Sequence, residues 1–334
     1  MARGVQLDLF GGSPAPATLD SGMLERDRAL MARVPSHVRF GTSSWSFPGW
    51  AGLVYAGAPT EKELADRGLE EYARHPLFSA VGIDRGYYAP LTRPTLERYA
   101  QQLPEGFPCV IKAFSEITSR VHPRTREKNP HFFDAEACKR DVIEPLQEAF
   151  ADHVGALVFE LMPLRRSELP TPQAFEVELQ QFLAALPKGI PYAVELRNRE
   201  LFTHGYLDVL AATGVGHVLN FWERMPAIGR QLEVPNVLSA PFVVSRVLIP
   251  PGQRYADTKR AFSPFDRMVA PQPEMRLDIA KLSEACALLG KTLLVIVNNK
   301  AEGSSPLTIR ALAETIVSQA GAAEPAAEPD LLRD

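Results

Sequence analysis

The sequence predicts a single eight-stranded parallel β/α (TIM-like) barrel, and two observations support this fold class. Eight short runs rich in apolar and β-branched residues recur along the chain, and a helix-length amphipathic segment follows most of them. The runs are apolar almost throughout, which is typical of strands that helices cover on both faces of a parallel sheet. Eight such units in 334 residues favour a closed barrel, with an open doubly wound sheet as the alternative.

The expected elements alternate regularly along the chain. The expected strands are residues 38–43, 78–84, 107–114, 154–160, 190–196, 215–221, 242–249 and 292–299. The expected helices are residues 62–75, 94–103, 134–150, 173–186, 199–212, 274–290 and 306–320. The last helix has the clearest start, because Ser305 can cap its free amides and Pro306 stands at the first helical position, where its missing N–H costs nothing.

Three segments lie outside this alternation. Residues 1–25 and 320–334 are rich in small residues, proline or acidic residues, and we expect disordered tails that flank a barrel domain at 36–319. The connection over residues 250–272 is long and contains several prolines, arginines and aromatic residues. Loops of that length in compact domains are usually lids or binding loops.

Composition excludes several classes of protein. The formal net charge of −4 is unlike that of a uniformly basic nucleic-acid coat protein, although it leaves room for a local basic cleft. The odd number of cysteines and the absence of CxxC spacing argue against a disulfide framework and predict a reducing, cytoplasmic location. No apolar run approaches the roughly 20 residues of a membrane span, so we expect no membrane partner.

Polar residues end nearly every expected strand. In a β/α barrel the carboxyl ends of the strands form the functional face, and an unpaired charge buried there is costly, so charges gathered at this end predict a site. The alternative is a structural ion network at the barrel mouth. The polar and aromatic residues at or after the strand ends are Ser44, Trp45, Asp84, Tyr87, Tyr88, Lys112, Glu160, Glu195, Arg197, Asn220, Arg246, Asn298, Asn299 and Lys300.

The cations among these residues predict an anionic ligand. Lys112, Arg197, Arg246 and Lys300 supply positive charge, and the side-chain amides of Asn298 and Asn299 add donors suited to a phosphate group. The segment KAEGSSPLT after the eighth strand leads into a helix N-terminus, a place that attracts phosphate, although an ordinary capped helix start explains it equally well. We include Ser44, Trp45, Asp84 and Tyr88 in the expected ligand-binding set.

Two carboxylates end neighbouring strands. Glu160 and Glu195 can supply a general acid and base if burial or charge pairing separates their pKa values, and Lys112 is the third candidate catalytic residue. Such a pair also suits glycoside cleavage. Ion pairing with Arg197 and Lys112 is the simpler interpretation, and it would lower the basicity of both carboxylates.

The sequence gives no support for a metal or a cofactor. The seven histidines lie mostly before strands or in helices and loops, and HExxH, GxGxxG, GxxxxGK[ST] and GxSxG elements are absent. Aromatic residues near the mouth suit stacking on bases or sugars, although a stretch such as WSFPGW is more typical of a hydrophobic cap on a barrel end.

A family resemblance rests on several of these residues. The segments GTSSWSFPGWAGLVY, VELRN and VNNK, with Tyr88 and Lys112 between them, resemble the domain of unknown function 72 family, also called YecE-like, over roughly residues 38–315. The resemblance implies a β/α barrel without a settled reaction. The residues that match the family pattern are Gly41, Ser44, Trp45, Tyr88, Lys112, Glu195, Arg197, Arg246 and Asn298.

The chain also departs from that family pattern. Gly82 and Asp84 stand where the family usually has a glutamate and an asparagine, Glu160 replaces a glutamine, and Leu248 replaces a frequent histidine. These departures weaken the implication of a shared catalytic mechanism, whereas the three cations of the pattern are retained.

The stretch QLDLF lies in the N-terminal tail, where a strand-like pattern is unexpected. It is similar to the clamp-binding peptide of bacterial replication and repair proteins, a glutamine followed by leucine, serine or aspartate, and Leu-Phe; the matching residues are Gln6, Leu7, Asp8, Leu9 and Phe10. By average composition, such a pentapeptide occurs in a chain of this length with a frequency on the order of one in a thousand. The resemblance implies that Leu9 and Phe10 insert into a partner pocket while Gln6 bonds at its edge; the alternative is an N-terminal strand at the barrel bottom.

These observations lead to one leading hypothesis and one rival. The first is a cytoplasmic barrel protein of bacterial DNA maintenance, tethered to the sliding clamp, that binds a phosphate-bearing ligand or nucleic acid. If it is an enzyme, we expect phosphoester hydrolysis, with Lys112, Arg197 and Arg246 stabilising charge and Glu195 as the base. The rival is a carbohydrate- or small-metabolite-processing hydrolase that uses Glu160 and Glu195.

Overall fold

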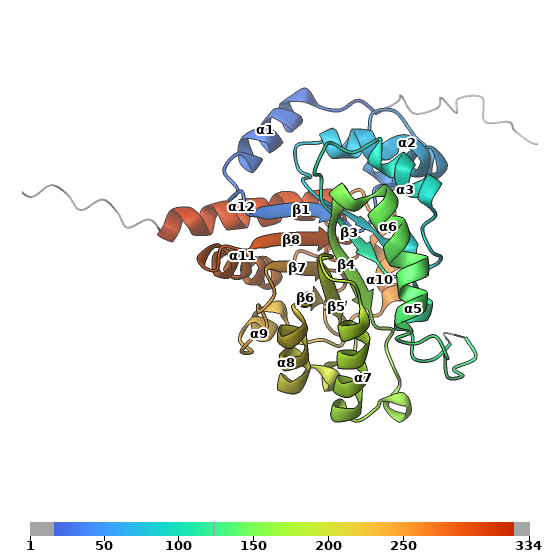
Figure 1. Ribbon diagram of the computed structural model, residues 1–334. Coiled ribbons are helices and arrows are strands. Elements are labelled where there is room, and N and C mark those ends of the chain that lie inside the picture. Colours follow the sequence, from blue (N-terminus) through green and yellow to red (C-terminus); the bar gives the residue numbers. More distant parts are fainter. Residues whose placement is uncertain (1–16, 123, 324–334) are drawn as a thin grey trace, which may run out of the picture.

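The computed structural model describes residues 17–122 and 124–323. It confirms the predicted fold class: eight parallel strands form one sheet in the order β1-β8-β7-β6-β5-β4-β3-β2, which curls into a nearly closed barrel with helices around it (Figure 1). The strands are β1 (Val38–Thr42), β2 (Val81–Ile83), β3 (Cys109–Lys112), β4 (Val154–Glu160), β5 (Tyr192–Glu195), β6 (Gly216–Phe221), β7 (Phe242–Val247) and β8 (Thr292–Val297).

The helices surround this sheet, and each of the seven expected helical regions contains one. They are α1 (Ser21–Met31), α2 (Glu61–Arg74), α3 (Arg93–Ala100), α4 (Ser115–Thr118), α5 (Ala135–Cys138), α6 (Glu144–Ala149), α7 (Pro172–Ala185), α8 (His204–Thr213), α9 (Ile228–Leu232), α10 (Tyr255–Phe262), α11 (Pro273–Leu288) and α12 (Ser305–Ala323). Among the described residues, no helix is long and apolar enough to cross a membrane.

The barrel closes at the seam between β1 and β2. The carbonyl of Phe40 accepts hydrogen bonds from the amides of Ser79 and Ala80, each at 2.9 Å. The Tyr72 hydroxyl of α2 accepts from the Thr42 amide at 2.8 Å and donates to the Ala80 carbonyl at 3.1 Å, so it bridges the two strands. Gly41 lies at this seam because a Cβ there would stand 2.3 Å from the Ala80 carbonyl oxygen. The seam fixes the first two strand ends of the barrel mouth.

Small and branched side chains fill the inside of the barrel. The inner cluster consists of Ala80, Val110, Ala156, Val158, Ala193, Val218, Val244, Leu294 and Ile296. A larger cluster packs between the strands and the surrounding helices. The interior below the mouth is therefore a packed core, as in other barrels of this type, and leaves the ligand-accessible space to the mouth.

Several predicted boundaries differ from the structure. The predicted tail at 1–25 overlaps α1, which begins at Ser21; Asp20 caps this helix, and its Asp27 pairs with Arg310 of α12. The predicted tail at 320–334 overlaps the end of α12, which continues to Ala323. The predicted helix at 134–150 is divided by a π-helical turn at Lys139–Ile143, because the proline that follows in α6 has no amide to continue the α-helical pattern.

The predicted loop at 250–272 is not wholly irregular, since it contains α10. The prediction missed this helix because the surrounding prolines break the apolar periodicity into pieces too short to recognise. The expected clamp-binding stretch, residues 6–10, lies outside the described residues.

Candidate functional site

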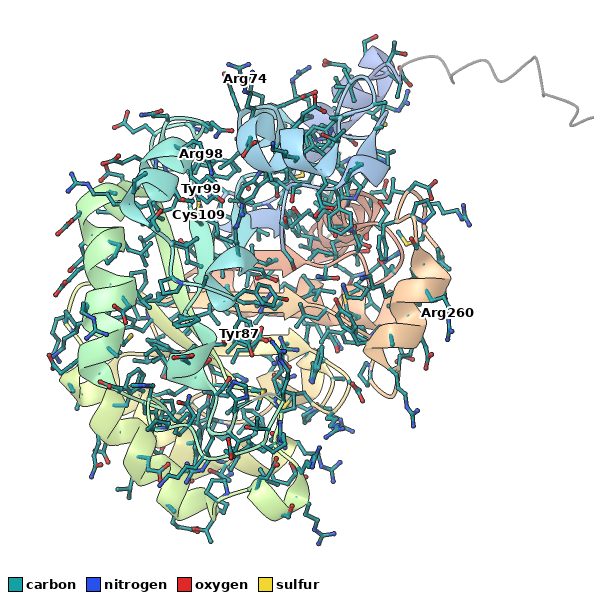
Figure 2. The ribbon with its side chains drawn as sticks, turned by 90° about the vertical axis from the view of Figure 1, so that its right-hand side faces the viewer. Arg74, Tyr87, Arg98, Tyr99, Cys109 and Arg260 are labelled. Atoms are coloured by element: carbon teal, nitrogen blue, oxygen red, sulfur yellow. The ribbon has the colours of Figure 1, made fainter. Side chains whose placement is uncertain are left out.

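Six charged side chains from five strand ends meet at the mouth of the barrel. Figure 2 views this end of the molecule, and Tyr87, which packs beside the charged groups, lies near its centre. We call the six residues the ion-pair cluster; they are Asp84, Lys112, Glu160, Glu195, Arg197 and Arg246. The cluster contains three carboxylates and three cations, so its formal charges cancel.

Arg246 of β7 connects the carboxylates of the cluster. Its Nη2 donates to Asp84 Oδ1 at 3.0 Å and Oδ2 at 3.1 Å. Its Nη1 donates to Glu160 Oε2 at 2.7 Å and to Glu195 Oε2 at 2.6 Å. Burial opposes the charge of this guanidinium, but attraction to Asp84, Glu195 and Glu160 outweighs it and raises the pKa of Arg246.

Glu160 accepts from three cations through one oxygen atom. Besides Arg246, Lys112 Nζ lies 2.9 Å and Arg197 Nη2 lies 2.8 Å from Glu160 Oε2. Burial raises the pKa of this carboxyl, but the three cations together hold the pKa of Glu160 well below its ordinary value. Glu160 is therefore ionised throughout the physiological pH range and fits the role of a charge partner better than that of a general acid.

Glu195 is enclosed by the cluster and shows no exposed surface. Its carboxylate pairs with Arg246 and with Arg197 Nη2, which lies 2.8 Å from Glu195 Oε1. The side-chain amide of Asn220 donates to the Leu196 carbonyl at 2.7 Å and lies 3.4 Å from the same Glu195 oxygen. These contacts favour the simpler of the two sequence interpretations of Glu160 and Glu195, ion pairing, over an acid and base pair.

Aromatic rings cover the cations of the cluster. The Trp222 ring lies 3.9 Å from the Arg197 guanidinium, and the Tyr87 ring lies 5.3 Å from Lys112 Nζ. The sequence placed Tyr87 after an expected strand end but gave no reason to pair either ring with a particular cation, because their partners come from other strands.

Lys300 differs from the other cations at the mouth. Its residue is only 9% exposed, yet within residues 17–122 and 124–323 it forms no ion pair. Its Nζ lies 4.6 Å from the Tyr255 ring centroid and 5.9 Å from that of Phe265. Burial, together with the nearby charges of Lys259 and Lys112, lowers the pKa of Lys300 to about 8, although Asp84 acts in the opposite direction.

Two asparagines hold the segment that carries Lys300. Asn299 Oδ1 accepts from Trp50 Nε1 at 3.2 Å, from the Ser305 amide at 2.8 Å and from the Ser305 hydroxyl at 2.9 Å. Asn298 Oδ1 accepts from the Lys300 amide at 3.1 Å. The structure thus assigns Asn299 to capping the start of α12, in place of the Ser305 cap expected from the sequence.

A cavity of about 880 Å³ lies beside the cluster at the mouth, and we call it the mouth cavity. Its walls come from the ends of β1, β2 and β8 and from α2 and α10. The lining residues are Ser43, Ser44, Ser46, Phe47, Trp50, Glu61, Lys62, Ala65, Asp66, Asp84, Arg85, Tyr88, Tyr255, Asn298, Asn299, Lys300 and Ser305.

The expected ligand-binding residues divide between this cavity and its surroundings. Ser44, Asp84, Tyr88, Asn298 and Asn299 line the mouth cavity, whereas Arg197 and Arg246 lie in the ion-pair cluster. The structure places Trp45 in the core instead, where its indole N–H donates to the Leu64 carbonyl at 2.9 Å and its ring packs edge-on against Tyr99. Lys300, which the sequence listed only as one cation among four, is the most distinctive residue of the cavity.

No candidate metal centre is found in the part of the chain that the structure describes, since no three or more His, Cys, Asp or Glu side chains are grouped to hold an ion. The three carboxylates of the ion-pair cluster are each held by cations, which is the opposite of the arrangement that a divalent metal requires.

The sequence profile described as protein of unknown function DUF72 matches residues 39–331. The chain belongs to the DUF72 family. A DUF72 protein of Enterococcus faecalis has a similar crystal structure, with a TM-score of 0.56 at 18% identity, covering 84% of this chain and 95% of that one. A DUF72 protein of Thermotoga maritima gives a TM-score of 0.55 at 16% identity, covering 84% of this chain and 99% of that one.

At these identities the two DUF72 structures support the fold alone. No curated protein matches the chain. The function must therefore be argued from the mouth cavity and the ion-pair cluster.

Proposed function

We propose that this DUF72 protein binds a phosphate-bearing ligand in the mouth cavity, with Lys300 as the main cation. The observation that supports it is the Lys300 residue, which is only 9% exposed and has no ion-pair partner in the described chain, on the wall of a cavity of about 880 Å³. A buried unpaired charge costs several kcal/mol, and an anionic ligand is the partner that would remove this cost.

The surroundings of Lys300 suit a phosphate group. The ion-pair cluster and Lys300 together hold three carboxylates and four cations, so Lys300 carries the formal excess of one positive charge because the cluster is balanced. The other charged residues of the cavity lining, Glu61, Lys62, Asp66 and Arg85, cancel formally. The Ser43 hydroxyl is buried and has no hydrogen-bond partner among the residues that the structure describes, and Ser43 and Asn298 line the same cavity. A phosphate oxygen can accept from an ammonium, a hydroxyl and an amide at once.

Calorimetric titration of the full chain with inorganic phosphate tests this proposal. We expect Lys300→Met to weaken phosphate binding at least about tenfold, in line with the loss of one charge-assisted hydrogen bond. Lys300→Arg keeps the charge and should retain most of the affinity. Lys281→Met, which removes an exposed lysine of α11, is the matched control and should bind like the wild type. Equal binding by Lys300→Met and the wild type would reject the proposal.

A narrower proposal concerns the reaction. If the bound ligand is a phosphoester and the protein hydrolyses it, Asp84 is the ionisable group of the cluster that reaches the mouth cavity, since its side chain is 26% exposed whereas Glu195 is enclosed. The role of base that the sequence gave to Glu195 therefore moves to Asp84 in this proposal. Release of p-nitrophenol from p-nitrophenyl phosphate by the wild type, and its loss in Asp84→Asn, would support it; a wild-type rate equal to buffer would reject it.

The second candidate function is a tether to the bacterial sliding clamp, and with it a cytoplasmic role in DNA replication or repair. The observation that favours it is the five-residue match of QLDLF at residues 6–10 to the clamp-binding peptide. A double variant, Leu9→Ala with Phe10→Ala, should abolish binding to purified clamp. Asp8→Ser is the matched control, because the consensus accepts either residue. Absence of any binding by the wild-type chain would end this proposal.

Nucleic acid is the phosphate-bearing ligand that a clamp-tethered protein would meet. Titration of labelled single- and double-stranded DNA at two salt concentrations tests it, since phosphate contacts make the affinity fall as salt rises. Binding that does not respond to salt, or no binding, would reject nucleic acid as the ligand of the mouth cavity. The titration with inorganic phosphate would still test whether the cavity binds phosphate.

A further inference from the structure

Two exposed tyrosines stand on the wall of the mouth cavity. Tyr88 is 79% exposed and Tyr255 is 50% exposed. In the described ranges, the other large apolar side chains with comparable exposure are aliphatic: Val177, Val269, Leu277, Leu288 and Leu289. Both exposed aromatic residues therefore line one cavity, although more than 160 positions separate them in the sequence.

The two rings come from opposite ends of the barrel sequence. Tyr88 follows the 3₁₀ turn Asp84–Tyr87 after β2, and Tyr255 is the first residue of α10, between β7 and β8. The curvature of the barrel brings both segments to the same mouth. In Figure 2, Arg260 marks α10 on the right and the Tyr87 label lies left of centre.

Each ring has a fixed neighbour on its protein side. Tyr88 packs edge-on against Tyr87 with ring centroids 5.5 Å apart, and the Tyr87 ring in turn covers Lys112. The Tyr255 ring lies 4.6 Å from Lys300 Nζ. Exposed aromatic surface of this kind is costly in water. A flat ligand ring that stacks on it contributes about 1–3 kcal/mol of binding free energy per stacked base.

We propose that Tyr88 and Tyr255 form a ring subsite, which holds the planar base of a nucleotide unit whose phosphate lies at Lys300. This inference rests on the proposed phosphate-binding function and names its ligand class. A nucleotide combines a flat heteroaromatic ring with a nearby phosphate. Tyr255 belongs to the ring subsite and also contacts Lys300, so it connects the two parts of the proposed site. A cavity of about 880 Å³ falls within the range of pockets that enclose ligands of this size.

Calorimetric titration with inorganic phosphate, adenosine and adenosine 5′-monophosphate separates the two subsites. We expect the monophosphate to bind the wild type more tightly than either part alone. Tyr88→Ala and Tyr255→Ala should each weaken binding of the monophosphate about 5- to 150-fold, the equivalent of one lost stacking contact. Tyr88→Ala should change phosphate affinity less than about twofold, whereas Tyr255→Ala also uncovers Lys300 and is judged on the monophosphate alone. Tyr88→Phe and Tyr255→Phe retain the ring and should bind like the wild type.

Leu288→Ala removes an 89% exposed side chain of α11 and is the control for a general surface effect; it should leave all three affinities unchanged. A pentanucleotide of deoxyadenosine distinguishes the sources of the nucleotide unit: tighter binding than the monophosphate indicates a strand, and weaker binding indicates a free nucleotide.

The outcomes distinguish this inference from the proposed function. If phosphate binds but the monophosphate gains nothing and the alanine variants change nothing, the ring subsite is rejected and phosphate binding stands. If the wild type does not bind phosphate, the proposed function fails and the nucleotide assignment fails with it.

Discussion

The ion-pair cluster and Lys300 differ in how their buried charges are neutralised, although both lie at the same barrel mouth. In the cluster, three cations and three carboxylates satisfy one another, with Arg246 bonded to all three acids. On the wall of the mouth cavity, Lys300 is largely buried against aromatic rings and has no such partner in the described chain. Removing one partner of a paired buried charge destabilises the fold, whereas a buried charge without a partner lowers the stability of the fold from the start. Functional sites often carry such a loss of stability, and this loss marks Lys300 as a candidate ligand contact.

The largest expected effect comes from breaking the balance of the cluster. Arg246→Met keeps most of the side-chain volume but leaves Asp84, Glu160 and Glu195 without their shared cation, so we expect a loss of about 3–5 kcal/mol in the free energy of unfolding. Urea unfolding at pH 7 measures it. Arg260→Met is the control. The Arg260 side chain is 82% exposed and pairs with Asp257, and such a surface pair contributes at most about 1 kcal/mol. Similar stabilities for the two variants would show that the cluster is not a unit.

The second effect has the opposite sign. A lysine whose pKa is lowered in the folded state destabilises the fold while it is protonated; this cost is complete below the folded pKa of about 8 and disappears as the pH approaches the ordinary value of 10.5. Lys300→Met should therefore raise the free energy of unfolding at pH 7, by at most about 3 kcal/mol, and the gain should shrink between pH 8 and pH 10.5.

Urea unfolding of Lys300→Met and the wild type at pH 7 and pH 9.5 measures this difference. A variant less stable than the wild type at pH 7 would mean that Lys300 has a stabilising partner after all, and the contrast between the two regions would not hold.

The same contrast explains what the sequence predicted and what it could not. The strands and most helices follow from apolar periodicity, which depends on neighbours along the chain. The gathering of Lys112, Glu160, Glu195 and Arg246 also followed, because parallel strands bring their carboxyl ends to one edge. The pairing of the two glutamates with Arg197 and Lys112 agrees with the simpler sequence interpretation. The bonding of Arg246 to three carboxylates did not follow from the sequence, because it depends on the register and curvature of the closed sheet.

Helix α1 was missed for a related reason. Helix α1 depends on a pair between Asp27 and Arg310, almost the full length of the chain apart, and no local pattern encodes such a contact. Trp45, expected at the ligand, is held in the core by the carbonyl of Leu64 in α2, a contact that arises only once α2 packs against the barrel.

A smaller effect on stability is expected at Asn299, which holds the segment that carries Lys300. Asn299→Ala removes the acceptor of Trp50 Nε1 and of the Ser305 amide, and we expect a loss of about 1–3 kcal/mol in the free energy of unfolding, because two buried donors are left unpaired. Asn298→Ala is the matched control at the preceding position, where the side-chain oxygen accepts one hydrogen bond within the described residues, from the Lys300 amide, and it should cost about 1 kcal/mol or less. Equal losses at the two positions would contradict the capping role of Asn299.

The smallest expected effect tests whether long-range charge contributes to the unbalanced state of Lys300. Lys259 of α10 is exposed, and its charge helps to lower the pKa of Lys300. Lys259→Ala should raise that pKa by less than about one unit, since an exposed charge acts largely through water and is screened by salt. The pH dependence of the chemical shift of a ¹⁵N-labelled Lys300 amine measures it, at low salt and again at high salt, where the difference between variant and wild type should diminish. An unchanged pKa of Lys300 on removal of Lys259 would mean that this charge does not reach the amine, and burial together with Lys112 would then account for the cost that Lys300 imposes.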